Sequence, residues 1–61
     1  MTTTQTYVNA GVARDLAKDL GVECMVTTDG EKIVIDFGGG YVVECVTLEG
    51  ACEEIREYAK H

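Results

Sequence analysis

Two segments in which apolar and polar residues alternate, separated by Asp29-Gly30, constrain the fold of this chain more than any other feature. They span residues 22–28 and 31–37, and alternation with a period of two is typical of half-buried β-strands. Asp-Gly between such segments is a strong signal for a two-residue hairpin turn. A turn at Asp29-Gly30 pairs Val26 with Ile33 and places six apolar side chains on one face. These are Val22, Cys24, Val26, Ile33, Ile35 and Phe37.

A third strand follows the hairpin. Three consecutive glycines, residues 38–40, predict a second turn, and residues 41–46 resume the alternation. With the glycines as the loop, Val43 lies opposite Ile35 and Cys45 lies opposite Ile33. The sequence therefore predicts a three-stranded antiparallel meander with one apolar face.

Helical patterns flank the three strands. Asn9 is a suitable N-cap for a helix that runs to about Leu20, and Gly21 occupies the C′ position that favours glycine. Thr47 is a suitable N-cap for a second helix. Its apolar positions follow helical spacing and are Leu48, Ala51, Cys52, Ile55, Tyr58 and Ala59. The predicted fold is α+β, in the order α-β-β-β-α, with both helices packed on one face of the meander.

Length and charge limit the classes of function. We expect residues 1–61 to form a single small acidic domain. Eleven Asp and Glu against five Lys and Arg give a formal net charge of -6. Binding to DNA, RNA or an anionic membrane requires clustered basic residues, so none of these is expected as a direct partner. A basic protein surface is the expected partner.

The remaining residues predict no catalytic or metal centre. The only histidine is His61, and the three cysteines form no CxxC pair. We therefore predict a protein that is not an enzyme, has no cofactor and uses its cysteines as small apolar residues. Residues 1–5 carry neither a basic nor an apolar segment of a secretion signal, so the expected location is the cytoplasm.

Carboxylates are concentrated in two places. One set lies on the polar face of the second predicted helix, and the other on the outer face of the predicted sheet. The sets are Glu49, Glu53, Glu54 and Glu57, and Glu23, Asp36 and Glu44. On the sheet, Glu23 is expected opposite Asp36, with Glu44 diagonal to Asp36. Each set is a candidate partner-binding site; a solvated face is the alternative for both, and a hard cation is a further alternative for the sheet set.

Apolar residues share the outer face of the sheet with these carboxylates. They are Met25, Val34, Val42 and Val46. Three interpretations remain open: a partner-binding surface, cover by the N-terminal segment through Tyr7 and Val8, or a homodimer interface.

The order and length of the elements resemble the double-stranded RNA-binding domain. That family is basic where its last helix begins, whereas residues 47–54 read Thr-Leu-Glu-Gly-Ala-Cys-Glu-Glu here, so the resemblance implies only the architecture. The short chain, the net acidity and the helical glutamates also resemble the small acidic inhibitors encoded by phages, including anti-CRISPR proteins. That resemblance implies a non-enzymatic inhibitor, acting in the host cytoplasm, that occupies a basic nucleic-acid-binding surface of its partner. Helical carboxylates about 5–6 Å apart would then mimic nucleic-acid phosphates. The alternative is a structural or regulatory module that dimerises or binds a partner through the outer face of its sheet.

Overall fold

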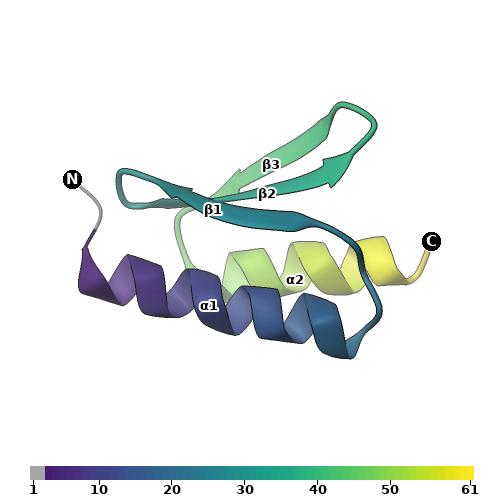
Figure 1. The fold of residues 1–61 in the computed structure, drawn as a ribbon, viewed down its shortest axis with the longest axis horizontal. Coiled ribbons are helices and arrows are strands. Elements are labelled where there is room, and N and C mark those ends of the chain that lie inside the picture. The colour runs from purple at the N-terminus through teal and green to yellow at the C-terminus, as the bar shows by residue number, and fades with distance from the viewer. Residues whose placement is uncertain (1–2) are drawn as a thin grey trace.

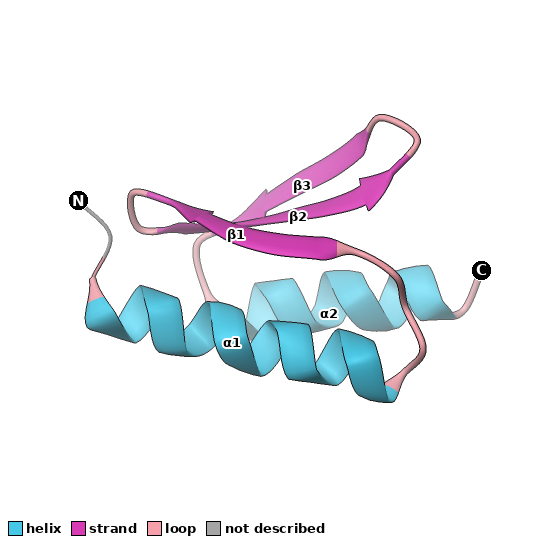
Figure 2. Ribbon diagram, in the orientation of Figure 1, coloured by secondary structure: helices cyan, strands magenta, loops and turns pink. Residues whose placement is uncertain are grey.

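Two helices and a three-stranded antiparallel sheet form two packed layers (Figures 1 and 2). The computed structural model describes residues 3–61, so Met1 and Thr2 of the predicted domain lie outside the described residues. The elements are α1 (Thr4–Asp19), β1 (Met25–Asp29), β2 (Lys32–Gly38), β3 (Tyr41–Cys45) and α2 (Leu48–Ala59). Both helices cover the same face of the sheet, whose strand order is β1-β2-β3. The predicted α-β-β-β-α order and α+β class are confirmed.

The two helices run parallel, and their C-terminal ends lie at the same end of the molecule (Figure 1). This direction follows from the topology, because the chain reverses an even number of times between α1 and α2: on entering β1, at each of the two hairpins and on entering α2. Helix α1 packs mainly against β1 and α2, while α2 packs against β3 as well as α1. None of the helices within residues 3–61 is long and apolar enough to cross a membrane.

Helix α1 begins earlier than the sequence predicts. Thr3 is the N-cap, and its Oγ1 accepts a hydrogen bond of 3.1 Å from the backbone N–H of Thr6. Asn9, the predicted cap, therefore lies inside the helix. The predicted end is correct, because Gly21 has a φ of 72° and its N–H bonds the carbonyl oxygen of Lys18. The N–H of Val22 bonds the carbonyl of Ala17, which completes a Schellman motif.

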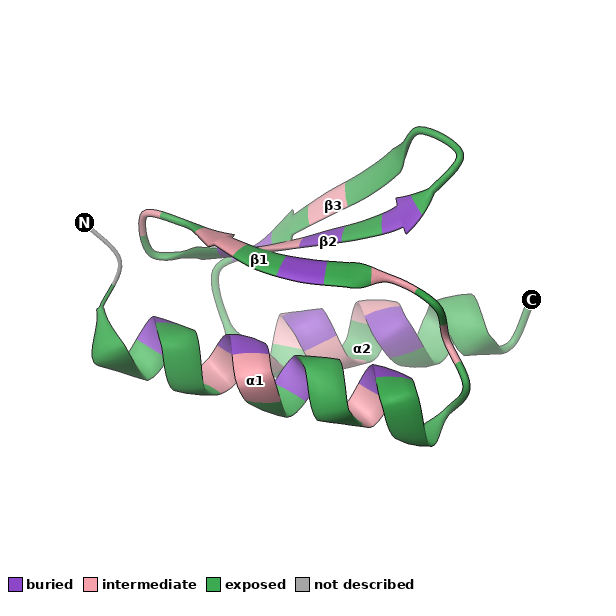
Figure 3. Cartoon of the chain, in the orientation of Figure 1, coloured by how far each residue is buried: buried purple, intermediate pink, exposed green. Residues whose placement is uncertain are grey.

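The core lies between the two layers (Figure 3). The fully buried apolar side chains of helix α1 are small: Ala10, Ala13 and Ala17, with the partly buried Leu16 packed against the core beside them. Small residues on this stripe let α1 approach its neighbours closely, while isoleucines fill the centre. Ile33 and Ile35 of β2 and Ile55 of α2 are the largest fully buried side chains.

The first hairpin is shifted by one residue at its turn. Asp29 pairs with Lys32, so the loop is Gly30-Glu31 rather than Asp29-Gly30. Gly30 has a φ of 63°, and no residue other than glycine has a positive φ among those described. Positive φ at the first loop position alone is the requirement of a type II′ turn, whereas a type I′ turn needs it at both. Val26 therefore lies opposite Ile35, and the predicted pairing of Val26 with Ile33 is wrong.

The second hairpin has the predicted register away from its turn, with Ile35 opposite Val43 and Ile33 opposite Cys45. The predicted three-glycine loop is wrong, because Gly38 belongs to β2 and only Gly39-Gly40 form the loop. Near its turn, Asp36 pairs with Val42 but Gly38 pairs with Tyr41, so Phe37 forms a β-bulge on β2. A bulge bends the strand and redirects its side chains. The Oδ1 atom of Asp36 accepts a hydrogen bond of 2.8 Å from the N–H of Gly38 across this bulge.

Candidate protein-binding surfaces

Helix α2 carries four of the predicted site residues, three of them on its solvent face. The side chain of Thr47 caps this helix, accepting a hydrogen bond of 3.0 Å from the N–H of Gly50. Glu49, Glu53 and Glu57 then follow at intervals of one turn and are exposed, and Glu54 is half-buried. The helix thus holds its carboxylates in a row along a rigid element.

Most of these carboxylates have no basic partner within residues 3–61. Glu57 forms an ion pair of 3.5 Å with Lys60, and both side chains are exposed. Arg56, three residues after Glu53, forms no ion pair with it among the described residues. Glu49, Glu53 and Glu54 are therefore uncompensated negative charges on one helix.

Glu54 lies on the side of α2 that faces β3, close to Cys45. Burial raises the pKa of the Cys45 thiol above its ordinary value of 9.0, and the Glu54 carboxylate adds to this rise. Burial also raises the pKa of Cys24. Both thiols are therefore neutral near pH 7 and are poor nucleophiles. All three cysteines are free, and Cys45 belongs to the core, as the sequence predicts.

The predicted arrangement of the sheet carboxylates is confirmed only in part: Glu44 is diagonal to Asp36, as predicted. Glu23 precedes β1, and Met25 is the residue opposite Asp36, so the predicted pairing of Glu23 with Asp36 is wrong. Glu44 lies opposite Val34 and forms an ion pair of 3.2 Å with Lys32. Within residues 3–61 no three His, Cys, Asp or Glu side chains are grouped so as to hold a metal ion. The cation interpretation of this set therefore has no geometric basis.

The outer face of the sheet remains uncovered within the described part of the chain (Figure 1). Met25 at 66% and Val42 at 49% are strongly exposed apolar side chains on it, and Val46, directly after the end of β3, is 76% exposed. Tyr7 and Val8 lie in α1, in the layer on the other side of the sheet, and both are exposed. The interpretation that they cover the outer face is wrong.

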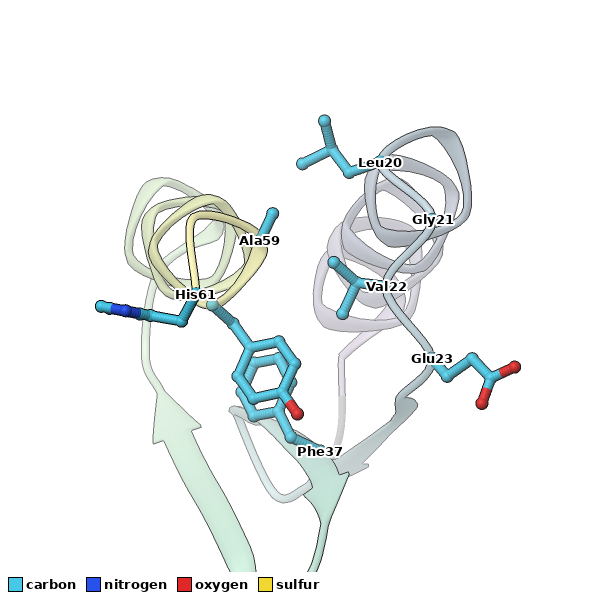
Figure 4. Close-up of a pocket in the computed structure, with 8 residues that line it drawn as sticks. Leu20, Gly21, Val22, Glu23, Phe37, Ala59 and His61 are labelled. Carbon is cyan, nitrogen blue, oxygen red and sulfur yellow. The ribbon is translucent and has the colours of Figure 1, made fainter.

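A cleft of about 450 Å³ lies between the C-terminal ends of α1 and α2 (Figure 4). We call it the helix-end cleft. Its lining residues come from both helix ends and from the sheet: Leu20, Gly21, Val22, Glu23, Phe37, Tyr58, Ala59 and His61. Leu20, Val22 and Ala59 point towards one another across the gap, and the Glu23 side chain extends outwards at the rim (Figure 4).

Stacked aromatic rings form the floor of the helix-end cleft. The Phe37 and Tyr58 rings have centroids 4.3 Å apart and planes inclined by 15°. Tyr41 extends the group, with its ring centroid 5.3 Å from that of Phe37. The bulge at Phe37 and the last turn of α2 therefore meet at this end of the molecule. The sequence pattern predicts that Phe37 and Tyr58 face the core, but no local pattern predicts that they line a common cleft.

A second, smaller cleft of about 330 Å³ lies beside the first. Both Glu23 and Asp36 line it, so the two carboxylates share a site despite the different register. Glu23 and Phe37 line both clefts.

Comparisons of the chain with protein-family models, with curated proteins and with solved structures found no significant match.

Proposed function

We propose that this chain is a non-enzymatic protein-binding domain that occupies a basic, nucleic-acid-binding surface of a partner, as inhibitors of the anti-CRISPR type do. The observation that carries the proposal is the exposed row that Glu49 and Glu53 begin on α2, with Glu54 beside it, all three without basic partners in the described residues. A rigid row of carboxylates about 5–6 Å apart offers negative charge at a spacing broadly like that of phosphates along one strand. The partner and the complex are expected in the cytoplasm.

The electrostatics support association with a basic surface rather than stability of the free domain. Exposed ion pairs such as Lys60 with Glu57 contribute little to folding. Like charges one turn apart on a helix, such as Glu49 and Glu53, are mildly destabilising. Their repulsion is relieved when Lys or Arg of a partner approaches, and the net charge of -6 steers such a partner towards the domain.

The test uses tagged protein to capture partners from a cytoplasmic lysate at low and high salt, followed by competition with DNA on the captured protein. The variant Glu49→Lys/Glu53→Lys should lose the partner. The control Asp29→Lys/Glu31→Lys changes the net charge by the same amount on and beside β1, an element that does not contact α2. It should retain most of the binding. Equal loss of binding in both variants, or binding that is insensitive to salt, would show that the acidic face of α2 is not the binding surface.

A second candidate function is a module that dimerises through the outer face of its sheet. The strong exposure of Met25, Val42 and Val46 favours it. It predicts a concentration-dependent mass by light scattering, and a monomer after Val42→Lys or Val46→Lys. Glu49→Lys/Glu53→Lys would leave that equilibrium nearly unchanged.

A further inference from the structure

The helix-end cleft combines a concave shape, exposed aromatic surface and negative electrostatic character. We infer that it binds an arginine side chain of the basic partner. This inference rests on the proposed function and adds a specific anchoring site at the far end of α2 from Glu49.

The ends of two parallel helices give the cleft its polarity. Each helix carries the equivalent of about half a negative charge at its C-terminus. Leu20 caps α1 and Lys60 caps α2, so both negative ends converge on the cleft. The basic residues of the two last turns, Lys18 and Arg56, do not line it. The ionisable side chains among the lining residues are Glu23, Tyr58 and His61, with neither lysine nor arginine, and the Glu23 carboxylate lies outside the rim (Figure 4).

The aromatic floor selects the kind of cation. Tyr58 stacks on Phe37 and remains 39% exposed, so part of its ring is accessible from the cleft. A guanidinium is planar and weakly hydrated, and it stacks on aromatic rings more readily than a lysine ammonium does. The methylene stem of an arginine requires apolar walls, which Leu20, Val22 and Ala59 provide (Figure 4).

Glu23 completes the complementarity. Its side chain is exposed at the rim and has no ion pair within residues 3–61. It extends outwards in this structure, so it has to turn about its side-chain bonds to reach a guanidinium in the cleft (Figure 4). A carboxylate can accept two parallel hydrogen bonds from one guanidinium, which lysine cannot supply. The volume of about 450 Å³ falls within the usual range for small-ligand sites and is ample for one side chain.

The first experiment titrates short peptides into the isotopically labelled protein and follows backbone amide shifts by NMR. The probes are acetyl-Gly-Arg-Gly-amide, its lysine analogue and its citrulline analogue, which keeps the planar shape but lacks the charge. The arginine peptide should shift Gly21, Val22, Glu23 and Ala59 and bind in the millimolar range. The other peptides should bind about two- to fivefold more weakly, the size expected for one cation–π contact at an exposed site.

Variants separate the cleft from the general acidity of the surface. Tyr58→Leu keeps an apolar side chain but removes the π face, and Tyr7→Leu is its control on an exposed tyrosine of α1. Glu23→Gln is matched with Glu31→Gln, which removes the same charge beside β1 and is also exposed. Tyr58→Leu and Glu23→Gln should each weaken the arginine peptide at least twofold, and their controls should not. Glu23→Gln alters no core residue, so it keeps the test valid if Tyr58→Leu loses stability.

Three results would overturn the inference: equal binding of the arginine and citrulline peptides, shifts confined to the glutamates of α2, or equal effects of the variants and their controls. None of these outcomes touches the proposed function, because partner capture depends on Glu49 and Glu53 in the lysate experiment. Conversely, the proposed function would be wrong if partner capture survived in the variant Glu49→Lys/Glu53→Lys.

Discussion

The Arg14 guanidinium donates a hydrogen bond of 2.7 Å from Nη2 to the carbonyl oxygen of Val26. Val26 belongs to β1, which lies at an edge of the sheet. No neighbouring strand on the outer side can therefore donate a hydrogen bond to this carbonyl. A side chain of α1 thereby satisfies an edge group and joins the helix layer to the sheet. No comparable contact to a backbone carbonyl of β3 occurs among the described side-chain hydrogen bonds.

Replacement of Arg14 by methionine should therefore destabilise the domain. Methionine keeps much of the apolar stem but donates no hydrogen bond, so the free energy of unfolding should fall by about 1 kcal/mol. Urea denaturation followed by circular dichroism measures the change. Lys18→Met, one turn further along α1, removes the same charge from an exposed side chain and should cost less than about 0.5 kcal/mol. Equal losses would mean that the bond to Val26 adds nothing.

The sequence predicts the order of elements because alternation, turn residues and caps agree with one another. It misplaces the start of α1 because Asn9 is as good a cap as Thr3 by residue type. Residues 4–9 include two threonines and a valine, which are weak helix formers. Packing of Thr6 and Ala10 against the rest of the fold holds this first part of α1 in place.

The hydrophobic pattern alone cannot predict the register of the first hairpin. Moving the loop by one residue changes the partner of Val26 by two positions, from Ile33 to Ile35. Because side chains alternate with a period of two, the same apolar set still faces the core. The hydrophobic pattern therefore cannot distinguish the two registers, and the choice depends on the φ of Gly30 and Glu31.

One of the two candidate sites can be predicted from the sequence and the other cannot. The row of glutamates on α2 follows directly from helical spacing, so sequence predicts its geometry well. The helix-end cleft depends on where the bulge places Phe37 and on two helices ending at the same level. Those are tertiary relationships between residues far apart in the chain, such as Leu20 and Tyr58, and no local pattern encodes them.

Gly11 lies inside α1 and offers a route to higher stability. A Cβ atom built on it meets no atom within 4 Å, and its φ is not positive. Gly11→Ala should therefore raise the free energy of unfolding by about 0.5–1 kcal/mol, because alanine restricts the unfolded chain and favours the helix. Gly21→Ala meets no atom either, but Gly21 has a φ of 72°, so this change should be destabilising. Thermal denaturation of both variants tests the contrast; a loss of stability in Gly11→Ala would contradict it.

Ile55 of α2 is fully buried. Stepwise truncation of its side chain should show that the free energy of unfolding of this domain is small. A domain of this length has about 3–9 kcal/mol in total. Ile55→Val should cost about 0.5–1.5 kcal/mol, whereas Ile55→Ala should cost about 2–5 kcal/mol and leave a substantial unfolded fraction. Calorimetry should show a melting temperature about 4–8 °C lower for each kcal/mol lost. Val46→Ala removes apolar atoms at a side chain that is 76% exposed, and it should change stability little.

Stability should also fall at alkaline pH through Cys45. The pKa of its thiol is raised by burial and by Glu54, so the folded state holds the proton more tightly than the unfolded state. The resulting stabilisation is complete below the unfolded pKa and is lost as the pH rises through the folded pKa. The loss of stability should therefore begin near the ordinary thiol pKa of 9.0.

Unfolding free energies measured across this pH range should decline less steeply in Cys45→Val, which keeps an apolar side chain of similar size. Glu54→Gln should give an intermediate slope, since it removes only the smaller cause. Cys24→Val controls for the other thiol whose pKa burial raises. If wild type and Cys45→Val lose stability in parallel, the burial of this thiol has no energetic consequence at alkaline pH.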